Sequence, residues 1–204
     1  MSRVDGAVIG RLRGLLASHN PREIEDPHLT PAAVTVLLYP KGKRYCVLMN
    51  RRSQQVRHHK GEIAFPGGER EPRDASLLET ALREAHEEMG VEPKDVDLLG
   101  RLDDTPTISH FLIRPFVGVI PYPYPFHPRP QEVAQVLEVP LEDLLDPASR
   151  RDDVRVKGDA LVRRPCFAHQ GHLIFGATAR ILEELLGLVR RAMDEESPWS
   201  REDR

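Results

Sequence analysis

The sequence of 204 residues has few cysteines, few aromatic residues and no long hydrophobic run. Its two cysteines, Cys46 and Cys166, lie far apart in the chain, so a disulfide framework is not expected and both are predicted to be buried, unreactive thiols. The first twenty residues lack an apolar stretch of signal-peptide length, and no later run approaches the about 18 apolar residues of a membrane-spanning helix. We therefore expect a cytoplasmic protein without a membrane partner.

The chain also lacks a strong charge of either sign. Its 29 Lys and Arg against 32 Asp and Glu give a formal net charge of −3, which provides no general attraction to nucleic acid or anionic membranes. No nucleic-acid partner is expected, and any phosphate chemistry must come from local charge. The sequence contains no internal repeat and no linker long enough to separate two cores. Residues 1–204 are therefore predicted to form one domain.

Hydrophobic spacing predicts helices and strands in alternation along the chain. The predicted helical segments are 4–17, 76–90, the short turn 141–147, and 177–193. The predicted strands are 32–39, 45–49, 98–100, 109–121, 132–139 and 172–175, and residues 148–165 are expected to form a surface loop or exposed hairpin. Residues 1–30 are interpreted as an N-terminal helix and a proline-rich linker, and 194–204 as a frayed tail. Pro115 favours an edge strand or a bulge.

The segment 76–90 has helix signals at both ends. Ser76 and Glu79 form a capping-box pattern, and Gly90 is suited to the left-handed residue that ends a helix. At about 100° per residue, five apolar residues share one stripe and three acids fall on the far side. The apolar residues are Leu78, Ala81, Leu82, Ala85 and Met89, and the acids are Glu84, Glu87 and Glu88. A helix with a core face and an acidic face is predicted.

Three carboxylates this close repel one another unless a cation neutralises them. The helix offers oxygen donors without a cysteine or a histidine pair at ligand spacing, which favours Mg²⁺ or Mn²⁺. Arg83 can hold Glu87 four residues later. For the helix alone, an acidic surface paired with basic neighbours is the alternative.

Two further segments flank this helix in the sequence. Residues 51–60 are the most basic stretch of the chain; such runs are usually solvated, but this one leads directly into the glycine-rich loop 61–68, which favours anion binding. Residues 121–130 alternate proline with bulky rings and form either a rigid surface connection or one wall of a substrate cleft.

One motif resembles the signature of the Nudix hydrolases. Phe65-Pro66-Gly67-Gly68 precedes Arg83-Glu84-Ala85-His86-Glu87-Glu88-Met89-Gly90-Val91, and the family pattern is Gly-x5-Glu-x7-Arg-Glu-apolar-x-Glu-Glu-x-Gly-apolar. Gly68 and Arg83 are one residue further apart than this pattern requires. Counting from Gly68 places the first acid at Asp74, whereas counting back from Arg83 places it at Ala75. Both positions remain open.

A second resemblance lies upstream. Leu48-Met49-Asn50-Arg51-Arg52-Ser53-x3-Arg57-x3-Gly61-x3-Phe65-Pro66-Gly67-Gly68 is similar to the extended motif of the coenzyme A pyrophosphatase subgroup. Met49 and Asn50 replace Leu and Thr of that motif. The one-residue lengthening and Phe175-Gly-Ala-Thr-Ala-Arg180 also resemble this subgroup.

The resemblance implies an α/β/α Nudix sandwich, with a mixed sheet between helices, and the hydrolysis of coenzyme A to 3′-phospho-AMP and 4′-phosphopantetheine. It assigns Glu84, Glu87 and Glu88 to Mg²⁺ or Mn²⁺, and a carbonyl near Gly68 is the candidate to complete one coordination sphere. Gly67 and Gly68 are also candidate substrate-binding residues. Arg52 and Arg57 are the candidates for the diphosphate or the 3′-phosphate, and Lys60, His58 and His59 are weaker ones. Glu132 is a candidate base or added ligand, against the alternative of a surface carboxylate.

Other functions remain open. The same fold accepts nucleoside triphosphates, ADP-ribose and other nucleotide sugars, and a nucleotide-binding module without catalysis is a further alternative. The expected partner is a small-molecule diphosphate substrate. A homodimer is one expected form of assembly.

Overall fold

The computed structural model describes residues 3–56, 59–157 and 160–193. An eight-stranded sheet forms its centre, with the order β3-β2-β1-β7-β5 and with β4 beside β1, β6 beside β7 and β8 beside β2. The strands are β1 Thr30–Lys41, β2 Arg44–Arg52, β3 Ile63–Ala64, β4 Gly67–Glu69, β5 Asp97–Arg101, β6 Thr105–Pro106, β7 Phe111–Val119 and β8 Val133–Pro140. β1 and β7 are parallel and the other pairs are antiparallel, so the expected mixed sheet is confirmed.

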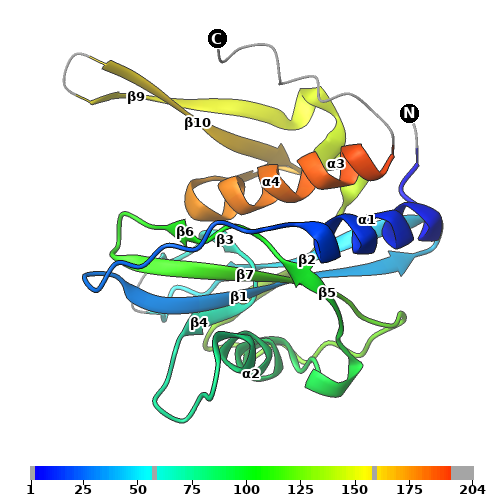
Figure 1. Ribbon diagram of the computed structural model, residues 1–204, viewed down its shortest axis with the longest axis horizontal. Coiled ribbons are helices and arrows are strands. Elements are labelled where there is room, and N and C mark those ends of the chain that lie inside the picture. The colour runs from blue at the N-terminus through cyan, green and yellow to red at the C-terminus, as the bar shows by residue number, and fades with distance from the viewer. Residues whose placement is uncertain (1–2, 57–58, 158–159, 194–204) are drawn as a thin grey trace.

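Helices cover both faces of this sheet (Figure 1). α1 (Gly6–Ser18) and α4 (Gly176–Ala192) lie against one face, and α2 (Leu77–Met89) lies against the other. The shorter elements are α3 (Leu141–Leu145) and the 3₁₀ turns η1 (Pro93–Asp95) and η2 (Pro147–Ser149). The layers match the α/β sandwich expected from the sequence.

A small antiparallel sheet accompanies α4. It comprises β9 (Arg150–Lys157), β10 (Ala160–His169) and β11 (His172–Ile174), in the order β11-β10-β9. The segment 148–165 is thus a hairpin, one of the two expected forms. The predicted tail, 194–204, lies outside the described residues.

The central strand β1 is buried on both faces, which explains its nearly continuous apolar sequence. Val36 and Leu38 face the core beneath α1 and α4, whereas Leu37 and Tyr39 face the core beside α2. This alternation follows from the two-residue period of a strand. Cys46 and Cys166 are both buried and unpaired, as predicted. Among the described residues, we find no helix with the length and apolarity needed to cross a membrane.

Of the two positions expected for Pro115, the edge strand is wrong, because β7 is an inner strand; the β5–β7 pair does have a register irregularity, between Leu98 and Gly100. Proline lacks an N–H and is tolerated here where the neighbour of β7 changes. β6 pairs with residues 112–113 and β5 pairs with residues 116–119, while the Pro115 carbonyl accepts a hydrogen bond from Leu102 N–H at 3.0 Å. The missing donor therefore falls at the gap between two short partners.

Candidate functional site

The helix that carries the acids is defined locally, as predicted. Ser76 Oγ accepts a hydrogen bond from Glu79 N–H at 3.2 Å, and the Glu79 carboxylate accepts one from Ala75 N–H at 2.6 Å. Gly90 ends α2 in the left-handed conformation, with φ of 72°. These caps fix the residues at which α2 begins and ends.

Three carboxylates converge beside the glycine-rich loop. Glu84 and Glu88 come from α2, Glu132 precedes β8, and one oxygen of each lies within 4.8 Å of the others. Glu88 is only 2% exposed, and the other two are half-buried. The prediction that all three helix acids lie on the far side from the core was therefore wrong for Glu88. Burial follows because α2 packs against β1 and β4, which turns Glu88 towards Gly67 of β4 and the Asn50 side chain of β2.

Glu88 is held by donors from two strands. Asn50 Nδ2 donates to Glu88 Oε2 at 3.1 Å, Gly67 N–H donates to the same oxygen at 3.3 Å, and Arg52 Nη1 lies 3.6 Å from Oε1. Burial nevertheless raises the pKa of Glu88 to about 8, because the neighbouring Arg52 offsets only part of the desolvation. Asn50 is a site residue that sequence reasoning treated only as a departure from a motif.

The two glycines of the loop leave room for the acids and the sheet. A Cβ on Gly68 would lie 2.5 Å from Glu84 Oε1, and one on Gly67 would lie 2.3 Å from the Ala33 carbonyl oxygen. Burial also raises the pKa of Glu84, against the effect of Arg83. A side chain at Gly68 would therefore displace a carboxylate, whereas one at Gly67 would separate β4 from β1.

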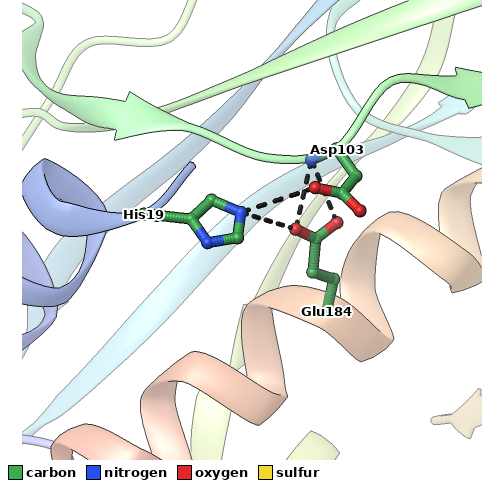
Figure 2. Close-up of side chains that lie close together, drawn as sticks. All are labelled: His19, Asp103 and Glu184. Atoms are coloured by element: carbon green, nitrogen blue, oxygen red, sulfur yellow. Dashed lines mark hydrogen bonds and ion pairs between the residues drawn. The ribbon is translucent and has the colours of Figure 1, made fainter. Parts of the chain in front are cut away.

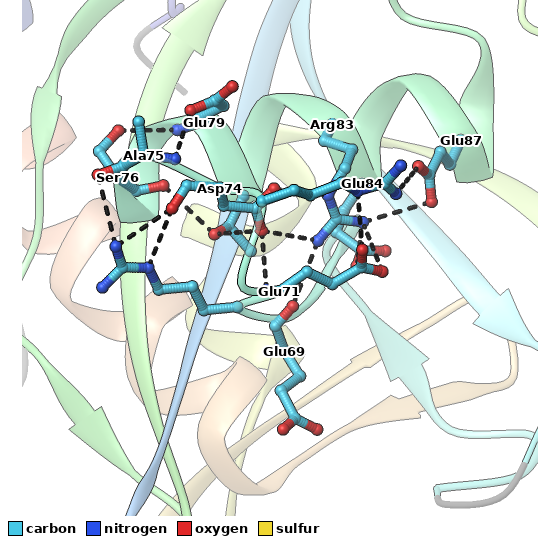
Figure 3. Close-up of polar contacts among 12 residues, drawn as sticks. Glu69, Glu71, Asp74, Ala75, Ser76, Glu79, Arg83, Glu84 and Glu87 are labelled. Carbon is cyan, nitrogen blue, oxygen red and sulfur yellow. Dashed lines mark hydrogen bonds and ion pairs between the residues drawn. The ribbon is translucent and has the colours of Figure 1, made fainter.

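The first acid of the Nudix-like motif, which the spacing placed at either Asp74 or Ala75, is Asp74. Its carboxylate accepts hydrogen bonds from Arg83 Nε at 2.9 Å and Nη2 at 3.0 Å, and also from Thr80 and Glu71 N–H (Figure 3). The Arg83 guanidinium holds the pKa of Asp74 well below its usual range. Asp74 therefore carries the acid that pairs with Arg83, and Ala75 does not.

Glu87 lies apart from the three converging acids. Its carboxylate contacts Arg83 Nη1 at 3.3 Å and Arg73 Nη2 at 3.1 Å. The same Arg83 nitrogen donates to Glu84 at 2.8 Å, so this guanidinium joins Glu84, Glu87 and Asp74. Glu87 therefore contacts only the arginines among these groups, whereas Glu84 contacts Arg83 and also converges with Glu88 and Glu132.

A cavity of about 330 Å³ opens beside the carboxylates. Gly67, Gly68 and Arg52 border it on the side of the acids, and Arg164 of β10 and Arg180 of α4 border it elsewhere. Burial, with the charges of Arg164 and Arg22, lowers the pKa of Arg180. An anion near Arg180 would relieve this repulsion.

Of the other predicted binding residues, only His59 borders the cavity within the described part of the chain. Arg57 and His58 lie outside the described residues, and Lys60 is exposed and is not part of the cavity lining. His59 borders the cavity, with ring nitrogens 3.0 Å from Glu62 Oε2 and 3.0 Å from Ser109 Oγ.

The proline-rich segment 121–130 supports α2 instead of forming a wall of this cavity. None of its residues borders the cavity, and the amides of His127 and Arg129 donate to the Met89 and Glu88 carbonyls, both at 2.9 Å. The ring of Tyr122 stacks on Tyr39 with centroids 5.5 Å apart. Of the two interpretations of this segment, a rigid connection or a wall of the substrate cleft, the contacts fit the rigid connection.

The donor set fits a hard divalent cation. Glu84, Glu88 and Glu132 offer only oxygens. Arg83, Arg52 and Arg129 each contact one of them, and the pKa of Glu88 stays raised because its burial outweighs the charge of Arg52. Mg²⁺ and Mn²⁺ prefer such ligands. The neighbouring cavity is mostly apolar and is bordered by Arg52, Arg164 and Arg180 as well as by Glu62, Glu69 and Asp153. An α/β sandwich that places the three carboxylates beside such a cavity is suited to metal-assisted hydrolysis of a phosphate compound.

Comparison with known proteins agrees with this class. The NUDIX domain model matches residues 29–157. A Photorhabdus laumondii protein described as "Uncharacterized Nudix hydrolase NudL" is 38% identical over 171 residues, which are 83% of this chain and 90% of that protein. One of the same description from Pectobacterium atrosepticum is 36% identical over 165 residues, covering 80% and 84%.

A solved structure supports the fold. The crystal structure of a MutT/nudix family protein from Enterococcus faecalis covers 91% of this chain and 74% of that chain, with a TM-score of 0.51 and 13% identity. The chain belongs to the NUDIX family. It is a Nudix hydrolase, and Nudix hydrolases generally use divalent metals such as Mg²⁺ or Mn²⁺.

Proposed function

We propose that this Nudix hydrolase cleaves the diphosphate linkage of coenzyme A or a close derivative, giving 3′-phospho-AMP and 4′-phosphopantetheine. Water provides the incoming oxygen, and one P–O bond of the diphosphate bridge breaks, so that each product keeps one phosphate of the linkage. The observation that carries this proposal is the cavity beside the acids, which has arginines both near Glu88 and at Arg164 and Arg180. A substrate with an additional phosphate suits this distribution of charge.

Glu84, Glu88 and Glu132 are proposed to hold Mg²⁺ or Mn²⁺, with the main chain at Gly68 as a further ligand and Glu87 as a ligand at the rim. When bound, the ions neutralise diphosphate charge and lower the pKa of the attacking water. Asn50 and Gly67 N–H keep Glu88 in place, and Arg83 keeps Glu84 in place. Because the leaving group is itself a phosphate, positioning and charge neutralisation account for most of the rate enhancement. The alternative role proposed for Glu132, in place of a ligand, is that of the base.

Arg52 is proposed to bind the diphosphate, because its guanidinium lies 3.6 Å from Glu88 and borders the cavity. Arg164 and Arg180 are proposed to bind the 3′-phosphate, since a guanidinium can hold two phosphate oxygens at once. Arg57 and Lys60 remain proposed contacts from the basic segment. Hydrolysis of ADP-ribose or a nucleoside triphosphate would use the same acids without a need for Arg164 and Arg180.

A side-by-side assay tests the substrate. Protein with Mg²⁺ or Mn²⁺ is incubated with coenzyme A, ADP-ribose, NADH, diadenosine polyphosphates and 8-oxo-dGTP, and products are separated by chromatography. We expect the highest kcat/KM for coenzyme A, with the two named products. Intact coenzyme A alongside cleavage of another compound would overturn the substrate, and no cleavage of any compound would favour a binding module. Glu84→Gln should abolish turnover without changing the circular dichroism spectrum.

The 3′-phosphate contact is tested by comparing coenzyme A with dephospho-coenzyme A. Arg180→Ala should lower kcat/KM for coenzyme A by about 10-fold or more, as expected for loss of a charge-assisted contact, while leaving dephospho-coenzyme A unaffected. Arg164→Ala should act in the same direction. Arg163→Ala is the matched control, because Arg163 lies next to Arg164 with a side chain that is 70% exposed and does not border the cavity. Equal losses on both substrates would contradict this assignment.

A further inference from the structure

A second group of metal-ligand side chains lies on the other side of the sheet from α2. His19 follows the C-terminal end of α1, Asp103 lies between β5 and β6, and Glu184 lies in α4 (Figure 2). These segments are far apart in the sequence, and α1 and α4 cover the face opposite α2 (Figure 1). The group is therefore separate from the carboxylates of the catalytic site.

The imidazole of His19 points between two carboxylate oxygens at a spacing that is long for hydrogen bonds. His19 Nε2 lies 3.5 Å from Asp103 Oδ1 and 3.3 Å from Glu184 Oε1, whereas N–H···O bonds are typically about 2.9–3.0 Å. This nitrogen is buried from solvent. Within the described part of the chain its two carboxylate contacts are at ion-pair distance, and neither meets the geometry of a hydrogen bond. A buried polar atom without a hydrogen-bond partner is unusual in a folded protein.

The two distances match the edges of a metal coordination polyhedron. With metal–ligand bonds of about 2.0–2.1 Å, two ligands of a tetrahedral ion are about 3.3–3.4 Å apart. The three ligand atoms also lie within 4.8 Å of one another. One imidazole nitrogen and two carboxylate oxygens form a mixed donor set that zinc-class ions accept, and that Mg²⁺ and Ca²⁺ favour less.

The two carboxylates are held in place by the main chain. Asp103 N–H donates to both oxygens of Glu184, at 3.1 and 3.2 Å, and Arg22 N–H donates to Asp103 Oδ1 at 2.8 Å. Burial, together with the nearby Asp103, raises the pKa of Glu184, while its hydrogen bond from Asp103 N–H acts in the opposite direction. The guanidinium of Arg22 lies further away, with Nε 4.0 Å from Asp103 Oδ2. Such outer contacts orient metal ligands in known sites.

We propose that His19, Asp103 and Glu184 bind one zinc-class divalent metal ion that links α1, α4 and the segment between β5 and β6. The side chains are 22%, 35% and 25% exposed, so water can complete the coordination. The role is structural, because the ion joins the N-terminal and C-terminal helices over the sheet. It does not depend on the proposed substrate.

The experiment uses the full-length protein with Glu84→Gln and Glu88→Gln, which removes acids of the catalytic site. After chelation and removal of the chelator, Zn²⁺ is titrated by calorimetry and Tm is measured with and without Zn²⁺. Co²⁺ then replaces Zn²⁺, and its visible absorption reports ligation by imidazole and carboxylate. We expect one equivalent of Zn²⁺ to bind and to raise Tm.

His19→Asn in this background should weaken Zn²⁺ binding at least 10-fold, remove the Tm increase and change the Co²⁺ spectrum. Glu184→Gln should do the same, which guards against a folding defect in one variant. His28→Asn is the matched control, because His28 is exposed in the same N-terminal part of the chain. Absent binding, or binding that His19→Asn and Glu184→Gln leave unchanged, would overturn the proposal and leave the group as an ion pair.

Discussion

The Arg83 guanidinium binds both carboxylate oxygens of Asp74, with Nε 2.9 Å from Oδ1 and Nη2 3.0 Å from Oδ2. Its remaining nitrogen donates to Glu84 at 2.8 Å. Arg83 therefore connects a buried acid that has no access to substrate with an acid of the proposed metal site. The orientation of Glu84 depends on a contact made nine positions earlier in the chain, at Asp74.

Breaking this pair is expected to destabilise the protein. Asp74→Asn removes the charged acceptor of two Arg83 hydrogen bonds, while Glu84 and Glu87 still contact the guanidinium, so the cost is about 1.5–3 kcal/mol. The folded-state pKa of Asp74 is lowered, so its contribution is present above the unfolded pKa of about 3.9 and is lost as pH falls through the folded value. Urea unfolding should show a large difference from wild type at pH 7 and a smaller one at pH 3. Glu25→Gln, at an exposed position, is the control; a difference independent of pH would contradict the explanation.

Alanine substitutions at the two loop glycines should have different effects, one mainly on activity and the other mainly on stability. Gly68→Ala directs a methyl group at Glu84 Oε1 and should lower kcat by about 100-fold or more, since misplacement of about 1 Å has effects of that size. Gly67→Ala directs a methyl group at the Ala33 backbone and should lower Tm more than Gly68→Ala does. Thermal unfolding and steady-state kinetics of both variants test this contrast. Equal Tm losses would show that the side chain of Glu84 does not adjust.

Glu88 should destabilise the metal-free protein. Its pKa is raised to about 8, so folding works against its ionised form at pH values above the unfolded pKa of about 4.3. In metal-free buffer at pH 9, Glu88→Gln should therefore unfold at a higher Tm than wild type. Mg²⁺ should raise the Tm of wild type and have little effect on the variant. A Mg²⁺-induced increase of equal size in both proteins would argue against Glu88 as a ligand.

Asn50 should act through Glu88 rather than on substrate. Asn50→Leu keeps a similar volume but removes the donor at 3.1 Å from Glu88 Oε2. Loss of such an orienting contact typically costs 10–100-fold in metal affinity or activity, so the Mg²⁺ concentration for half-maximal activity should rise by about 10-fold or more. KM for substrate at saturating Mg²⁺ should change little. Asn20→Leu is the control at an exposed asparagine, and an unchanged Mg²⁺ dependence would contradict the role.

Local sequence signals predicted the elements well, because each signal acts within a few residues. The caps at Ser76 and Gly90 appear as expected, and β1 shows the apolar run of a strand buried on both faces. Pro115 was misplaced because a missing N–H can be tolerated wherever a neighbouring strand ends, and strand order is not visible in a local pattern.

For the site, the sequence by itself determined that a glycine-rich loop precedes a capped helix and that this helix carries three acids. The positions of these acids along one helix follow from their spacing and require no tertiary contact. Only the tertiary structure decided which acids converge: Glu132 joins Glu84 and Glu88, while Glu87 contacts Arg73 and Arg83. It also brought in Asn50 and placed Arg164 and Arg180 beside one cavity. These positions depend on how α2, β2, β10 and α4 pack against one another. Packing brings together residues that are far apart in the sequence, and their contact cannot be predicted from local sequence patterns.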